Sequence, residues 1–141
     1  MLLYEALRYN IKGRQCLSAQ SKYYTVDIGF RNILFIGKEA DHGHILENMV
    51  YLEPIRRGYE TYVGQLGNGE VDFVTLAPEG MMYSQVATNA PDEKVLEREL
   101  SPLRKIHNNY PKYLLTLDEV FAEADYGGIR KINAIDWLLG E

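Results

Sequence analysis

Residues that could do chemistry are concentrated between Glu70 and Ala87. Glu70 and Asp72 alternate with apolar residues, and this period of two predicts a half-buried strand. A turn and a second strand over 81–87 follow, so the two strands should form a hairpin. Because strand residues of one parity face the same way, Asp72 could lie beside Gln85 and Ala87 if the register allows. An acid on one strand and a polar-x-small triplet on the next is the skeleton of a metal-dependent nuclease site, although two usual residues of such a site are missing.

The hairpin needs neighbouring elements to position its polar residues. Pro54 falls in the interior of the main helix, expected over 41–58, and predicts a kink or an early end there. Ser101 and Pro102 predict that the second helix restarts, with Ser as its cap and Pro at its first position. We therefore expect consecutive antiparallel strands over 60–66, 70–76 and 81–87, flanked by helices over 42–53 and 92–105.

The remaining segments complete an α/β pattern with a mixed sheet and flanking helices. A chain of 141 residues is expected to form one domain, residues 1–141, with a lead-in over 1–21 and a core over 22–141. Trp137 should pack inward from the last helix. The expected segments are a short helix over 2–9, a strand over 22–26, a short helix over 28–35 capped by Asp27, strands over 113–117 and 129–132, and a terminal helix over 134–139.

The charge balance argues against a dedicated nucleic-acid binder. The formal net charge is −5, whereas such proteins usually have a basic balance. A local basic edge could still form from Arg104, Lys105 and His107 together with Arg56 and Arg57, although solvated surface is the commoner role of such residues. Nucleic acid is therefore expected to be a weak ligand at most.

The single cysteine and the hydropathy pattern bear on the compartment. Cys16 has no partner within the chain for a disulfide and cannot build a cysteine-based zinc site, so we interpret it as a small core residue in a reducing environment. No apolar run approaches membrane length, and the N-terminus lacks a signal-peptide pattern. We expect a cytoplasmic protein without a membrane partner.

A series of short motifs runs along nearly the whole chain. They are KYYTVDIGFRN at 22–32, GHILENMVYLE at 43–53, RGY at 57–59, EVDFV at 70–74, QV at 85–86, NYPKY at 109–113 and TLD at 116–118. Together they resemble a large prokaryotic family of AAA-type ATPases. This chain departs from the family motif at Pro54, where the motif has a leucine. The C-terminal domain of that family is a domain of unknown function with a restriction-endonuclease-like fold. The phosphate loop of the ATPase half is absent, so we expect a fragment or a gene that kept only the C-terminal domain.

The resemblance implies a core of the PD-(D/E)xK type, whose active members use a helix Glu, a strand Asp and then Glu-x-Lys. By position, Glu47 matches the helix Glu, Asp72 the strand Asp, Gln85 the second acid and Ala87 the lysine. Gln85 can offer a neutral oxygen, and Glu70 could supply a substitute carboxylate. Carboxylates of Glu47, Glu70 and Asp72 would suit Mg²⁺, which prefers hard oxygen ligands. Because nothing nearby replaces the lysine at Ala87, the implied site is degenerate, and no cofactor is expected unless Mg²⁺ binds.

Each of these residues also has a structural interpretation. Glu47 is as readily a salt-bridged helix residue as a ligand, and Gln85 could simply hydrogen-bond across the sheet. Glu53, inside the apolar stripe, is expected to pair with a buried Arg or Tyr. His42 and His44 are two residues apart, and we interpret them as part of a loop and helix N-terminus, with metal binding a minority option.

Three functional hypotheses follow. The first is a catalytically degenerate nuclease-fold module that binds a protein or nucleic acid for a companion AAA-type ATPase. The second is an active Mg²⁺ nuclease that uses Glu47, Glu70 and Asp72 with Gln85. The third is a structural or oligomerisation domain. Metal binding would single out the second hypothesis, and salt-dependent DNA affinity would separate the first from the third.

Overall fold

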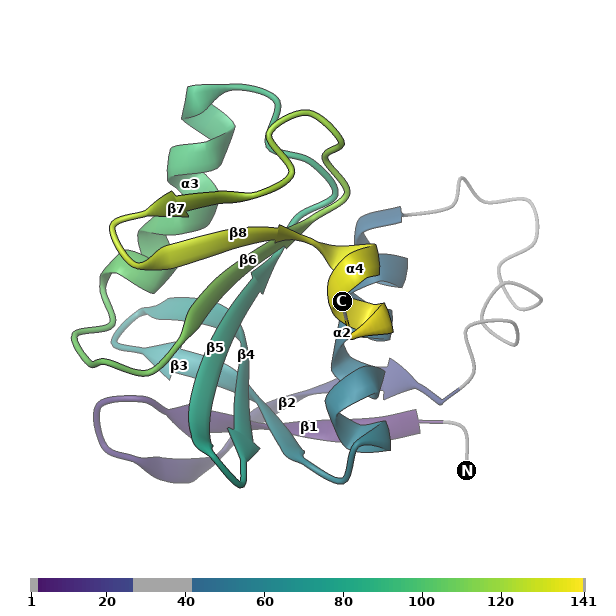
Figure 1. Cartoon of the computed structure of the whole chain (residues 1–141). Helices are drawn as coiled ribbons and strands as arrows, with labels where there is room; N and C mark the ends of the chain where they lie inside the picture. Colours follow the sequence, from purple (N-terminus) through teal and green to yellow (C-terminus); the bar gives the residue numbers. More distant parts are fainter. Residues whose placement is uncertain (1–2, 27–41, 141) are drawn as a thin grey trace.

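The computed structural model describes residues 3–26 and 42–140, which form a mixed sheet covered by helices on both faces (Figure 1). The described part of the sheet has eight strands in the order β2-β1-β3-β4-β5-β6-β8-β7. This confirms the predicted α/β class with a mixed sheet and flanking helices. The elements are β1 (Leu3–Asn10), β2 (Gln15–Thr25), α2 (His42–Arg56), β3 (Glu60–Leu66), β4 (Gly69–Ala77), β5 (Gly80–Val86), α3 (Glu93–Arg104), β6 (Lys112–Thr116), β7 (Ala124–Tyr126), β8 (Ile129–Asn133) and α4 (Ala134–Leu139).

The centre of the sheet is the predicted run of antiparallel strands. β3 pairs with β4 and β4 with β5, each in antiparallel register. Gly67 and Gly80 adopt positive φ values of 60° and 129° in the two turns, a region that glycine enters at little cost. β6 then continues the sheet parallel to β5, and β8 lies parallel to β6. The predicted strands over 113–117 and 129–132 are thus confirmed to within one residue at either end.

The N-terminal segment is a strand, and the predicted helix over 2–9 is wrong. β1 pairs antiparallel with β2 along its length and parallel with β3 at residues 8–10, so the sheet supplies partners for its backbone groups. A short isolated helix would have lacked this support, because helices of such length need packing to persist. Residues 3–10 and 15–21, expected as a lead-in, therefore belong to the sheet. Cys16 lies exposed on β2 and is not the core residue that we expected.

Prolines interrupt neither long helix. α2 continues through Pro54 to Arg56, and α3 runs without a break through Pro102, so the predicted restart at Ser101 is wrong. An interior proline costs about 3 kcal/mol or more, because it removes one backbone hydrogen bond and crowds the preceding turn. Burial of Leu100 and Leu103, both fully inaccessible, offsets this cost at about 1.5–3 kcal/mol for each side chain.

Two hydrophobic clusters cover the two faces of the sheet. One cluster packs Leu46 and Val50 of α2 against Phe73 of β4, with Trp137 of α4 partly buried against it as predicted. The other cluster packs α3 against the opposite face, where its core residues include Leu100, Leu103, Val71, Val74, Tyr83 and Leu114. The molecule therefore has three layers, with α2 and α4 on one side and α3 on the other (Figure 1).

Three further outcomes concern the ends and connections. The helix predicted over 28–35 and its cap Asp27 lie outside the described residues. The short strand β7, missed by the sequence analysis, pairs with β8 across a turn in which Gly127 and Gly128 both have positive φ values. No helix in the described ranges is both long and apolar enough to cross a membrane.

Candidate functional site

Asp72 lies in a β-bulge at the middle of the sheet. On β3 and β4, Tyr62 pairs with Val74 and Gly64 pairs with Val71, so Asp72 and its successor together oppose a single residue of β3. Such a bulge locally twists the strand and redirects its side chains. A Cβ on Gly64 would lie 3.0 Å from the Val71 Cβ and 3.0 Å from a Val74 methyl, so a side chain at this position would crowd the strand beside the bulge.

The β4–β5 pair changes its bonding next to this bulge. The ladder is regular from Ala77–Gly80 to Phe73–Ser84. One residue further, the Asp72 N–H donates to Gln85 Oε1 at 3.1 Å, and the Val86 N–H donates to Asp72 Oδ2 at 2.8 Å. Side-chain oxygens of Gln85 and Asp72 thus accept hydrogen bonds from backbone N–H groups at the point where the regular ladder ends. Asp72 and Gln85 are therefore neighbours across the two strands, while the shared face that the alternation predicts for their side chains stays a prediction.

Gln85 has a second partner on the opposite layer. Its Nε2 lies 3.5 Å from Glu99 Oε2 on α3. Gln85 is therefore engaged by β4 and approached by α3, which agrees with the structural interpretation of this residue. Ala87 follows the end of β5, and its N–H donates to the Leu115 carbonyl at 3.0 Å.

Lys22 of β2 reaches the acidic residues from a distant part of the chain. Its Nζ lies 2.5 Å from Glu70 Oε1 and 4.0 Å from Glu47 Oε1. The other Glu70 oxygen, Oε2, accepts from Arg8 Nη1 at 2.8 Å. We call Glu47, Glu70 and Asp72, with Lys22 among them, the carboxylate cluster. It is an arrangement of opposite charges rather than of acids alone.

Glu47 is oriented by its own helix and by β2. The Tyr24 hydroxyl donates to Glu47 Oε1 at 2.6 Å, and the Tyr24 ring stacks on Tyr51 with centroids 4.3 Å apart. The next residue, buried Asn48, exchanges hydrogen bonds with the backbone of Thr25, since its Oδ1 accepts from the N–H and its Nδ2 donates to the carbonyl, both at 2.9 Å. These contacts fasten α2 to the end of β2 and so fix the place of Glu47.

The site has an unusual charge distribution. Burial raises the pKa of Asp72 to about 7, with Glu47 and Glu99 adding to the effect, while the Val86 N–H and Lys22 oppose it. Asp72 therefore holds its proton to a much higher pH than an exposed aspartate does. Burial also acts to raise the pKa of Glu70, but the hydrogen bonds from Lys22 and Arg8 outweigh it and hold that pKa below its usual range.

Lys22 and Tyr24, which both donate to these acids, keep their protons. Burial acts to lower the pKa of Lys22, yet its bond to Glu70 and the surrounding acids raise the pKa overall. Burial, followed by the hydrogen bond to Glu47, raises the pKa of Tyr24 far above its usual range. Lys22 therefore stays a cation, and Tyr24 remains a neutral donor.

Protein donors already engage the carboxylates of this cluster. Among the described residues, no three His, Cys, Asp or Glu side chains are placed to hold one. Both oxygens of Glu70 accept from cationic side chains, one oxygen of Glu47 accepts from Tyr24, and one oxygen of Asp72 accepts from a backbone N–H. Mg²⁺ would need several such oxygens at once.

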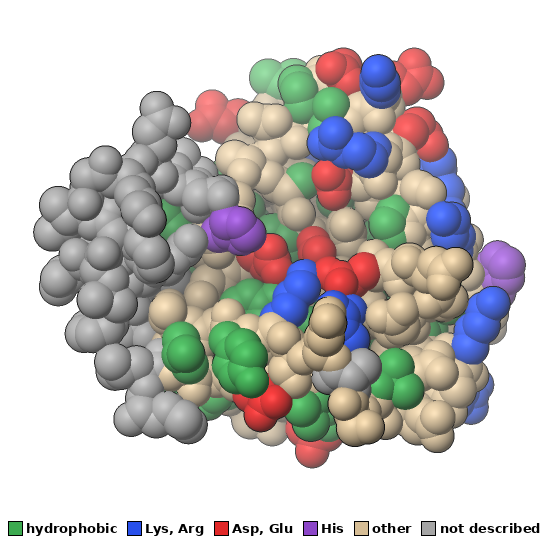
Figure 2. All heavy atoms as spheres, turned by 180° about the vertical axis from the view of Figure 1, so that it is seen from behind, with side chains coloured by type: hydrophobic (Ala, Val, Ile, Leu, Met, Phe, Trp, Pro, Cys, Tyr) green, Lys and Arg blue, Asp and Glu red, His purple; other side chains and the backbone are tan. Residues whose placement is uncertain are grey.

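One face of the molecule presents this mixture of charges at its surface. Figure 2 shows acidic side chains gathered near the middle of that face, bordered by Lys and Arg side chains and by a histidine. The side chains of Lys22 and Glu70 are each about one third exposed, at 34% and 35%. The carboxylate cluster is therefore open to solvent at Lys22 and Glu70, while Asp72 is partly buried.

Sequence reasoning missed Lys22 and the partners of Glu53. Lys22 opens the KYY motif and lies two residues from Tyr24 on the same strand, which is the only signal that could have linked it to Glu47. Lys22 is far from Ala87 in the sequence, so the residues around Ala87 contain no sign of it. Glu53 pairs with Arg56 and Arg57 at the helix end, and not with a buried Arg or Tyr.

The remaining predicted residues divide between different surfaces. Arg56 and Arg57 are bound to Glu53, whereas Arg104, Lys105 and His107 line a pocket at the end of α3, so the five do not form one basic edge. His44 lies exposed near the start of α2.

Asp118, from the TLD motif, forms a second acid–lysine pair. Its Oδ2 lies 2.8 Å from Lys131 Nζ and accepts from the Ala90 N–H at 3.0 Å. The Thr116 hydroxyl donates to the same oxygen at 3.3 Å. Lys131 is 3% exposed, so this ion pair is buried between β8 and the loop after β6.

The chain is similar in sequence to a longer bacterial protein. The chain is 36% identical over 138 residues to an uncharacterized protein of Haemophilus influenzae, a match that covers 98% of this chain. The chain spans about a third of that relative, 34% of its length. No family model matches the chain. No solved structure matches it either.

Proposed function

We propose that this chain is a restriction-endonuclease-like module with a degenerate site, which serves as a binding module for a companion AAA-type ATPase. The observation that carries the proposal is the Lys22 ammonium group, which lies 2.5 Å from Glu70 and 4.0 Å from Glu47. A protein cation thus occupies the carboxylates that a nuclease of this type would use for a metal ion. Gln85, bonded to the Asp72 N–H, supplies no negative charge in place of the second acid.

The proposed association rests on the motif resemblance and on the length of the relative. The match leaves about two thirds of the Haemophilus influenzae protein uncovered, which is room that an ATPase half would need. We expect the module to bind its ATPase partner in the cytoplasm, where ATP is available to the ATPase.

The direct test is a cleavage assay with the purified chain. Supercoiled plasmid, linear duplex, branched DNA and RNA are incubated separately with Mg²⁺ and Mn²⁺, with Asp72→Ala as the contamination control. We expect no cleavage above that control, because charge stabilisation and an activated water supply most of the rate of phosphodiester hydrolysis. Turnover that depends on Asp72 would contradict the proposal.

A gain-of-function variant tests whether the remaining residues are placed well enough to support phosphodiester cleavage. Gln85→Glu combined with Ala87→Lys restores the residue types that the resemblance implies at these positions. A missing preorganised charge typically costs about two to three orders of magnitude in rate. Activity in this double variant alone would support a degenerate nuclease fold.

The second candidate is an active nuclease in which Lys22 supplies the missing positive charge. It is favoured by one observation, that Lys22 lies close enough to lower the pKa of Asp72. In the same assay, this candidate requires turnover that is lost in both Asp72→Ala and Lys22→Ala. Turnover that survives Lys22→Ala would exclude the role of Lys22.

A further inference from the structure

The loop between β6 and β7 exposes two large apolar side chains at its tip. Val120 and Phe121, adjacent in the sequence, are 75% and 80% exposed. Phe121 has a φ of 53°, a left-handed conformation that is strained for a bulky side chain. Packing within the described chain does not offset this strain, since the ring lies largely in solvent. The tip of this loop is therefore a candidate for contact with another molecule.

Two acidic residues border the apolar pair. Glu119 precedes Val120, Glu123 follows two residues after Phe121, and both glutamates are exposed. Among the ion pairs of the described residues, none includes either glutamate. We call residues 119–123 the loop tip. It presents two apolar side chains between two carboxylates that have no counterion in the described ranges.

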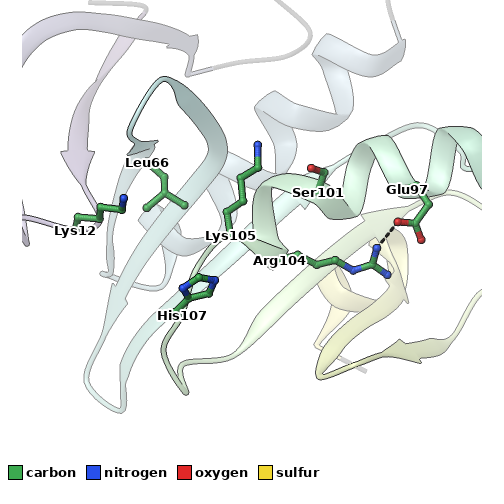
Figure 3. Close-up of a pocket in the computed structure, with 7 residues that line it drawn as sticks. All are labelled: Lys12, Leu66, Glu97, Ser101, Arg104, Lys105 and His107. Carbon is green, nitrogen blue, oxygen red and sulfur yellow. Dashed lines mark hydrogen bonds and ion pairs between the residues drawn. The ribbon is translucent and has the colours of Figure 1, made fainter.

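A cation-lined pocket lies at the C-terminal end of α3. It has a volume of about 450 Å³, and its lining combines Leu66 with Lys12 of the β1–β2 turn and Lys105. Figure 3 shows Leu66 between the two lysines, while Arg104 turns along α3 toward Glu97, with which it forms an ion pair. Neither lysine forms an ion pair with another described residue. The pocket thus offers an apolar surface between two cations.

The loop tip and the cation-lined pocket lie at opposite ends of α3 (Figure 1). Phe121 lines a hollow together with Glu93, which belongs to the first turn of the helix. The Asp118 carboxylate accepts a hydrogen bond from the Ala90 N–H at 3.0 Å, and this bond anchors the loop near that end. A helix of 12 residues is about 18 Å long. The two surfaces are therefore too far apart to meet within one molecule.

We propose that the loop tip of one molecule docks into the cation-lined pocket of a second copy of this chain. The argument is charge complementarity: the tip carries apolar side chains between two acids, and the pocket carries an apolar surface between two lysines. The tip would cover Leu66 and the methylene stems of the lysines, while its glutamates pair with the ammonium groups. Cations also favour the face of an aromatic ring, which suits Phe121.

Such a contact is heterologous, because it joins two different surfaces. Each pair keeps one free tip and one free pocket, so further copies add head to tail unless a ring closes. The contact is small, so we expect weak association that depends on protein concentration. The inference goes beyond the proposed function, since it needs neither the carboxylate cluster nor an ATPase partner.

The first test is sedimentation velocity of the full chain between about 10 and 500 μM, a range suited to weak association. At about 0.1 M salt, the weight-average sedimentation coefficient should rise with concentration. At about 1 M salt the rise should shrink, because the Debye length falls from about 10 Å to about 3 Å and the ion pairs are screened. A chain that stays monomeric at the highest concentration and the lower salt would overturn the inference.

A variant at the loop tip removes the ring without a folding defect. Asparagine tolerates the left-handed conformation better than phenylalanine, so Phe121→Asn should be at least as stable as the wild type. It should weaken association at least about fivefold, since aromatic anchors dominate the energy of such contacts. The matched control is Leu139→Asn, which removes a 69% exposed side chain from α4 and should stay within about twofold of the wild type. Equal weakening in the two variants would overturn the inference.

Mixing two variants distinguishes this contact from a symmetric one. Phe121→Asn keeps the pocket, whereas Lys12→Glu combined with Lys105→Glu keeps the loop tip and reverses the charge of the pocket. Each variant alone should associate at least about fivefold more weakly than the wild type. An equimolar mixture should form a dimer of about wild-type affinity, because one intact tip meets one intact pocket. A mixture that associates no better than the separate variants would contradict the head-to-tail contact.

Discussion

The carboxylate cluster and the Asp118–Lys131 pair use the same residue types to opposite effect. Burial acts to raise the pKa of Asp118, but Lys131, the Ala90 N–H and Thr116 outweigh it and lower the pKa overall. At Asp72, burial prevails and raises the pKa to about 7, although the Val86 N–H and Lys22 oppose it. Asp118 has a direct counterion within hydrogen-bond distance, while Lys22 donates to Glu70 and leaves Asp72 to weaker, longer-range attraction.

Asp118 and Lys131 thus form a structural ion pair, whereas the Asp72 carboxylate is desolvated without a direct counterion. An acid that is desolvated without a direct counterion lowers stability, and such groups are concentrated at functional sites. Structural ion-pair networks also contain acids with shifted pKa values. Measurements of stability and of metal binding on both acid–lysine sites therefore test the difference between them.

The largest expected effect is on the buried pair. Lys131→Met removes the counterion and leaves the Asp118 carboxylate buried, which should lower the free energy of unfolding by about 3–5 kcal/mol. Urea denaturation followed by circular dichroism measures this loss. Lys22→Met is the matched control and should cost about 1 kcal/mol or less, because its ion pair is one third exposed. Similar losses in the two variants would remove the distinction between the sites.

The next effect concerns Asp72 and pH. The folded protein holds the Asp72 proton more tightly than the unfolded chain, whose pKa is near the ordinary value of 3.8. The stability that this group contributes is therefore fully present below pH 3.8 and is lost as the pH rises toward about 7. Asp72→Asn keeps an oxygen for the Val86 N–H but cannot ionise, so it should stabilise the protein at pH 8 by on the order of 3 kcal/mol.

The measurement is the difference in unfolding free energy between Asp72→Asn and wild type from pH 4 to pH 8. It should start near zero and grow through the interval from pH 4 to pH 7. The corresponding variant Asp118→Asn should show the opposite sign, because the pKa of Asp118 is lowered in the folded state. A flat difference for Asp72→Asn would mean that its carboxylate is not desolvated as described.

A smaller loss of stability is expected from a change at Gly64, next to the β-bulge that contains Asp72. Gly64→Ala places a Cβ 3.0 Å from the Val71 Cβ and 3.1 Å from the Val71 carbonyl oxygen, and such overpacking costs about 1–3 kcal/mol. Thermal unfolding measures the cost, and the amide resonance of Val86 reports whether Asp72 has moved. Gly13→Ala is the control, since the nearest atom there belongs to the movable Asn10 side chain.

The smallest effect concerns metal affinity. Lys22→Ala removes the cation between Glu70 and Glu47, so Mn²⁺ should bind the variant about tenfold more tightly than the wild type. Electron paramagnetic resonance of free Mn²⁺ measures the affinity. The control Lys94→Ala removes an exposed lysine from another element and should leave the affinity unchanged. An unchanged affinity in Lys22→Ala would show that the ammonium group is not what keeps a cation out.

Sequence alone determined the elements whose signals are local. The period of two in 70–74 and the turn after it predicted the central hairpin. The helix predicted from residue 92 begins there, since Asp92 caps α3 by accepting from the Val95 N–H at 2.8 Å. The neighbourhood of Asp72 and Gln85 follows from the same alternation. These features depend on residues within one hairpin or one helical turn, so the local sequence is enough to predict them.

Only the tertiary structure decided what surrounds Asp72. Lys22 lies 48 residues before Glu70, and their contact exists because β2 and β4 are brought together through β1 and β3. The strand conformation of residues 3–10 likewise depends on two partners, one of which is β3, more than 50 residues away. Charge pairing and desolvation depend on distances through space, and a local pattern contains no information about a partner so remote in the chain.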